Sequence, residues 1–162
     1  MSPFLLRALL IASLALGPAR AAFAESDAEV AAHRSILDLA GAFTNDGFKL
    51  RDGDYTGTLL PGKSVVIQVN LYAGNQYWFA VSTADSKSAL SINLYDETGN
   101  LLKTEPFATQ ADSTVKQPPD PDATATNRAA AGFAPDLSGP YYVRIANSSS
   151  LPATFCLIYS YK

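Results

Sequence analysis

The sequence predicts an all-β protein, a jelly-roll-like antiparallel β-sandwich of about eight strands with one N-terminal α-helix. Apolar residues recur at every second position in several stretches, which is typical of half-buried strands. Clusters of Gly, Pro, Asn and Asp separate these stretches at short intervals. Only residues 25–44 combine a helical apolar period with a helix-start signal.

Residues 1–24 have the pattern of a secretory signal peptide. A short basic segment, 1–7, precedes an apolar run, 8–17, and Ala22-Phe23-Ala24 matches a small-x-small cleavage site. The run is shorter than the roughly 20 residues that span a bilayer, and no cysteine follows it to carry a lipid. We expect an exported chain, periplasmic or extracellular, without stable membrane insertion.

The charge balance argues against two classes of partner. Cleavage after Ala24 removes Arg7 and Arg20, so ten Lys and Arg remain against fifteen Asp and Glu, a formal net charge of −5. An acidic chain without a basic cluster is a poor ligand for nucleic acid or anionic lipid. Cys156 is the single cysteine, so an intrachain disulfide is excluded.

Residues 25–44 form the predicted helix, within an N-terminal segment that we place at 25–47. Ser26 and Glu29 fit a capping box, and Asn45-Asp46-Gly47 ends the helix. Its apolar stripe comprises Val30, Ile36, Leu37, Ala40 and Phe43. A membrane-surface helix is disfavoured, because Arg34 is the one clear cation on the polar face.

The sandwich domain, 48–162, centres on two alternating strands, 64–71 and 76–83. Their inward residues are Val65, Ile67, Val69 and Leu71 in the first strand, and Tyr77, Phe79 and Val81 in the second. Ala73-Gly74-Asn75 lies between them. A short Gly/Asn turn between two such strands predicts an antiparallel hairpin.

Six further stretches read as strands: 55–60, 88–95, 101–105, 129–133, 141–146 and 153–161. A hairpin turn is expected at 96–100, where Gly and Asn accommodate positive φ angles. Residues 106–127 are rich in Pro and Asp and predict a long surface loop. Several strands fall short of the roughly 9–11 residues that cross an outer membrane, which argues against a membrane barrel.

The order of motifs from residue 57 to 161 resembles the bacterial pre-peptidase C-terminal domain family. The matching motifs are Gly57-Thr-Leu59, Gly62-Lys-Ser64, Ala73-Gly74, Tyr77-Trp-Phe79, Ile92-Asn-Leu-Tyr-Asp96 with Gly99, Pro135-Asp-Leu-Ser-Gly139 and Tyr142-Val-Arg144. The resemblance implies a jelly-roll sandwich with an accessory, ligand-binding or structural role, sometimes with calcium. A stand-alone copy behind a helix also resembles small exported bacterial proteins.

Catalytic signals are sparse, and we expect a non-enzyme. His33 is the only histidine, and the chain has no Gly-x-Ser-x-Gly elbow. Zinc sites need several His or Cys ligands, whereas only His33 and Cys156 are present. Cys156 alternates with Phe155 and Leu157 in a predicted strand, which favours a buried structural thiol over a reactive one.

Three acidic pairs lie in predicted turns or loops: Asp52 and Asp54, Asp96 and Glu97, and Asp120 and Asp122. Paired carboxylates serve glycoside hydrolysis, but Asp is also common in turns for conformational reasons, and we favour the second explanation. No cofactor is expected. Were a metal to bind, it would be calcium, at Asp52 and Asp54 or at Asp120 and Asp122, although neither pair follows an EF-hand pattern.

Three aromatic residues are predicted to point away from the core: Trp78, Tyr142 and Tyr72. Exposed aromatic rings stack on sugars or anchor protein partners. Alternatively, the N-terminal helix or the long loop covers them. We therefore expect a non-enzymatic binding module for carbohydrate or another cell-envelope component. The alternative is a structural or protein-interaction module, with calcium as the candidate stabilising ion, and a hydrolase is a distant third.

Overall fold

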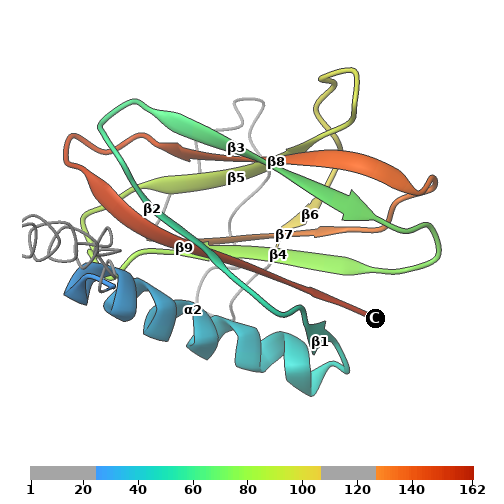
Figure 1. The fold of residues 1–162 in the computed structure, drawn as a ribbon, viewed down its shortest axis with the longest axis horizontal. Helices are drawn as coiled ribbons and strands as arrows, with labels where there is room; N and C mark the ends of the chain where they lie inside the picture. Colours follow the sequence, from blue (N-terminus) through green and yellow to red (C-terminus); the bar gives the residue numbers. More distant parts are fainter. Residues whose placement is uncertain (1–24, 107–126) are drawn as a thin grey trace, which may run out of the picture.

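The computed structural model describes residues 25–106 and 127–162 and confirms the β-sandwich with an N-terminal helix (Figure 1). The predicted signal peptide and positions 107–126 of the predicted loop lie outside the described residues. The elements are α2 (Asp27–Asn45), β1 (Lys49–Leu50), β2 (Tyr55–Leu59), β3 (Ser64–Leu71), β4 (Tyr77–Ser82), β5 (Leu90–Tyr95), β6 (Glu105–Pro106), β7 (Arg128–Phe133), β8 (Gly139–Asn147) and β9 (Ala153–Tyr161).

The strands form two antiparallel sheets. Sheet A has the order β1-β9-β4-β7-β6, with β2 pairing along the same edge of β9 as β1, and sheet B has the order β3-β8-β5. From β2 to β5 each strand lies in the opposite sheet from the one before it, and β7, β8 and β9 alternate in the same way. This alternation of successive strands between two packed sheets confirms the predicted jelly-roll-like sandwich.

The predicted hairpin of 64–71 with 76–83 is wrong. β3 pairs with β8, whereas β4 pairs with β7 and β9 in the other sheet. The physical reason is burial: β3 exposes every second residue over most of its length, but β4 is buried on both faces and needs a neighbour on each side and a covering layer. The chain between them crosses from one sheet to the other, and the Tyr72 N–H donates to the Tyr77 hydroxyl at 2.9 Å.

The core lies between the sheets. Its largest fully buried members include Phe79, Leu71, Leu90, Leu94, Ile145, Leu157, Val81 and Val143. These belong to the rows that alternation predicted to point inward. The apolar rows of β3 and β4 therefore face each other across the core instead of lying side by side in one sheet.

Helix α2 covers the outer face of sheet A (Figure 1). Its buried residues are Ala32, Ile36, Leu39, Ala40 and Phe43, which pack with Ala80, Cys156 and Ile158. Val30 and Leu37, predicted in the apolar stripe, are instead 43% and 46% exposed. The contact stripe runs through the small residues Ala32 and Ala40, because small side chains let the helix approach the sheet closely.

Both predicted ends of the helix are confirmed. The Ser26 hydroxyl accepts the Glu29 N–H at 3.3 Å, and the Glu29 carboxylate accepts the Ser26 N–H at 2.8 Å. These hydrogen bonds lower the pKa of Glu29. Gly47 follows with φ +85°, which ends the helix. Across the two described ranges, no helix has the length and apolar character to cross a bilayer.

Replacing Gly41 by Ala should stabilise the protein by about 0.5–1 kcal/mol. Gly41 lies inside α2 and is exposed, and an added Cβ meets no atom within 4 Å, so only the backbone-entropy term changes. Urea unfolding measures the gain. The matched control is Gly47→Ala, which should destabilise the protein because an L side chain is strained at φ +85°. Equal effects of the two changes would contradict this explanation.

Candidate functional site

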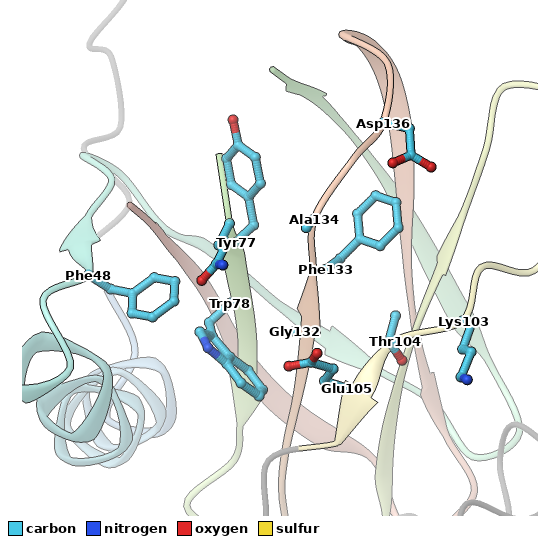
Figure 2. A pocket seen from close by; sticks show the side chains of 11 residues that line it. Phe48, Tyr77, Trp78, Lys103, Thr104, Glu105, Gly132, Phe133, Ala134 and Asp136 are labelled. Carbon is cyan, nitrogen blue, oxygen red and sulfur yellow. The ribbon is translucent and has the colours of Figure 1, made fainter. Parts of the chain in front are cut away.

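A groove with a volume of about 480 Å³ lies beside the C-terminal end of α2, where β4, β7 and β6 run next to one another (Figure 2). Its volume falls within the range of small-ligand sites. The side chains that give it chemical character are Phe48, Trp78, Lys103, Glu105, Phe133 and Asp136. The lining is therefore mixed, with aromatic rings beside two carboxylates and one amine.

Trp78 forms one wall of the groove. It lies on the outer face of β4, as predicted, and its ring stacks on Phe43 of α2 with centroids 5.2 Å apart and planes 12° from parallel. In the sheet it lies opposite Gly132 of β7. A Cβ on Gly132 would lie 3.0 Å from Cζ2 and Cη2 of the indole, so glycine is what allows the indole to lie across β7.

Glu105 completes a row across three strands. It pairs with Gly132, which pairs in turn with Trp78, so the three residues are direct cross-strand neighbours on β6, β7 and β4. Opposite residues in antiparallel strands share a face. Figure 2 shows the Glu105 carboxylate beside Gly132, on the side of Trp78. Sequence reasoning did not single out Glu105, because its place depends on pairing with a strand more than 20 residues away.

The three predicted aromatic residues do not form one surface. Trp78 is half-buried and packs against the helix-side cluster, which is the set of buried residues between α2 and sheet A. The alternative that the helix covers Trp78 therefore holds for one face of its ring, which stacks on Phe43. Tyr142 lies in sheet B opposite Gln68 and Tyr95, between the inward-facing Tyr141 and Val143. Tyr72 is 58% exposed at the crossing after β3. Trp78 and Tyr142 thus lie on opposite outer faces.

The predicted calcium residues are only partly placed. Asp52 and Asp54 lie in the link between β1 and β2, and Asp120 and Asp122 lie outside the described residues. In the parts of the chain that the structure describes, no group of three or more His, Cys, Asp or Glu side chains is arranged to hold a metal. Asp96 serves its turn: hydrogen bonds from Asn100 and Thr98 lower the pKa of Asp96 to about 2.

The structure also joins three residues that the sequence left separate. The Asp54 carboxylate lies 3.9 Å from Nδ1 of His33 and accepts a hydrogen bond from the Cys156 thiol at 3.5 Å. Burial, with the negative charge of Asp54, raises the pKa of Cys156 to about 12. Cys156 is buried among the residues that pack between α2 and sheet A, as the sequence predicted, and a reactive cysteine would need the opposite pKa shift.

Gly132→Ala should destabilise the protein by about 1–3 kcal/mol and change the emission of Trp78, the only tryptophan. The new Cβ would press on an indole that Phe43 already holds from α2. Thermal unfolding and fluorescence measure both effects. Gly139→Ala is the control, since a Cβ there meets nothing within 4 Å. An unchanged emission in Gly132→Ala would contradict the contact.

The Cys156 thiol should resist alkylation in the folded protein at pH 8 and react quickly after unfolding. Because the pKa of the thiol is raised from 9.0 to about 12 on folding, the protonated thiol favours the folded state below pH 9. That contribution is lost as the pH rises from about 9 to about 12. The melting temperature should therefore fall more over this interval in the wild type than in Cys156→Ala, and equal falls would contradict the assignment.

Comparison with known proteins gives no further information about this groove. No protein-family model matches the chain, and no curated protein matches it. The candidate site therefore rests on the described residues alone.

Proposed function

We propose that this protein is an exported, non-enzymatic binding module that holds a carbohydrate of the cell envelope in the groove beside Trp78. The observation that carries the proposal is the row formed by Trp78, Gly132 and Glu105, which sets an aromatic ring and a carboxylate along one hollow of about 480 Å³. Two sequence features support it further: the signal-peptide pattern in residues 1–24 and the resemblance to exported accessory domains.

The lining suits a sugar because a pyranose offers apolar C–H groups beside hydroxyl groups. Phe48 and Trp78 supply apolar contact, with one indole face already occupied by Phe43. Glu105 and Asp136 accept hydrogen bonds from hydroxyl groups, and Lys103 donates them. Both signs of charge are present, which favours a neutral polar ligand over a strongly charged one.

The chain supplies its own reporter for this proposal. Trp78 is the only tryptophan and lines the groove, so a bound sugar should change its fluorescence. Titration of the purified protein with peptidoglycan fragments, glucans and other envelope oligosaccharides should give a saturable change for at least one class. Glu105→Gln should weaken that binding by about tenfold or more, because a charged acceptor contributes about 1.5–3 kcal/mol.

The matched control is Glu97→Gln, which makes the same change in the turn after β5, away from the groove lining. It should bind like the wild type. A flat titration with every sugar at millimolar concentration, together with a negative glycan array, would remove the carbohydrate proposal. An equal loss in both variants would place the sugar outside the groove.

A further inference from the structure

The outermost strand of sheet B is unusually open. β3 (Ser64–Leu71) has eight residues and, within the described ranges, pairs only with β8. Alternate backbone N–H and C=O groups of such an edge strand point away from the sheet. They form a row of donors and acceptors that fits another strand.

The other sheet edges carry devices that block pairing. On one edge of sheet A, β1 and β2 are short and are separated by Arg51, Asp52 and Asp54. On the other edge, β6 has two residues and ends in Pro106. At β5, the chain folds back through the 96–100 turn, and the Leu102 N–H donates to the Leu94 carbonyl at 2.9 Å. Charges, prolines and covering segments are the usual protections of edge strands.

Among the described residues, β3 has none of these protections. It contains no proline and no charged residue, and the next charge after Lys63 is Asp85. Its inward residues Val65 and Ile67 are only partly buried, so the core reaches the surface here. On the outer face Val66 is 56% exposed. An added strand with the same alternation would cover the inward residues on one face and Val66 on the other.

We propose that β3 pairs antiparallel with β3 of a second copy of this chain, so that the two sheets B become one continuous sheet. In a strand pair related by a twofold axis, a charged side chain close to the axis lies near the same side chain of the second copy. Such like-charge neighbours destabilise the pair. A strand without charge escapes that penalty. It also offers no charge attraction to an acidic or basic peptide, which favours a second copy as the occupant.

The alternation restricts the register. Residues directly opposite in an antiparallel pair share a face, so only registers that set inward residues against inward residues keep both cores on one side. Pairing centred on Ile67 does so for residues 64–70, and Leu71 then extends past the end of the partner subunit's strand. It places Val65 opposite Val69 of the partner subunit, and Val66 opposite Gln68 of the partner subunit. The apolar row then continues from one core into the next.

This inference goes beyond the proposed function. The groove lies against sheet A, whereas β3 is the edge of sheet B, so pairing leaves the groove open. A dimer would carry two grooves on one body, and two linked sites raise the apparent affinity for a polymer that repeats its ligand.

Sedimentation equilibrium of the purified protein tests the pairing. The wild type should show a reversible, concentration-dependent dimer, since strand-edge interfaces are small. The double variant Val66→Lys with Gln68→Lys sets like charges across the axis and should raise the dimer dissociation constant by about tenfold or more. Thr56→Lys adds a charge at an exposed position of β2, the edge strand of sheet A, and should dimerise like the wild type.

A charge-reversed partner keeps the test independent of folding. The variant Val66→Glu with Gln68→Glu should also be monomeric, and mixing it with the lysine variant should restore a dimer of one copy of each. Circular dichroism of each variant should match the wild type. A wild type that stays monomeric up to millimolar concentration would overturn the proposal. So would a dimer that the Thr56→Lys variant loses equally, or a mixture in which no dimer returns.

Discussion

The arrangement depends on one strand that is buried on both faces. β4 presents Phe79 and Val81 to the space between the sheets, and Ala80 and Trp78 to helix α2. A strand in this position must have its backbone groups paired on both sides, because unpaired groups in an apolar interior are costly. β9 and β7 supply those partners, and α2 supplies the covering layer.

The position of the groove follows from where helix α2 stops covering sheet A. Helix α2 stops at Asn45, and Phe48 then packs against the helix-side cluster at the edge of the covered region. Beyond it, Trp78 lies across Gly132, where any side chain would collide with the indole. The same glycine that lets the helix, the indole and β7 pack closely also leaves a hollow that Glu105 borders. Packing and the candidate binding chemistry therefore share residues, as is common where a small set of polar groups is placed on a rigid sheet.

The two sheets differ in how their surfaces are completed. Sheet A has a helix on its outer face and short strands at both edges. In sheet B the eight uncharged residues of β3 form an edge with the core close to the surface. Within the described residues, this open edge lies on the sheet away from the groove. The groove of the proposed function and the edge of the proposed pairing therefore share no residues.

Local features of this protein were readable from its sequence, because they depend on neighbouring residues. The capping box at Ser26 and Glu29, the bounds of β9 and the inward rows of most strands are all set by period and turn chemistry. Even the outward direction of Trp78 follows from alternation. The two-sheet architecture was accessible because many short alternating strands have few other ways to bury one face each.

Partner choice was decided only in three dimensions. Alternation states which face of a strand is buried but not which strand lies beside it. The sequence therefore predicts a hairpin of β3 with β4, whereas the two strands lie in opposite sheets. The prediction that Val30 and Leu37 belong to the buried stripe of α2 was wrong for a similar reason, since both are as apolar as the residues that α2 buries. The contacts of Asp54 with His33 and Cys156, and the row from Trp78 to Glu105, join residues distant in sequence. Such contacts are fixed by the packing of whole layers, which no single stretch of the chain contains.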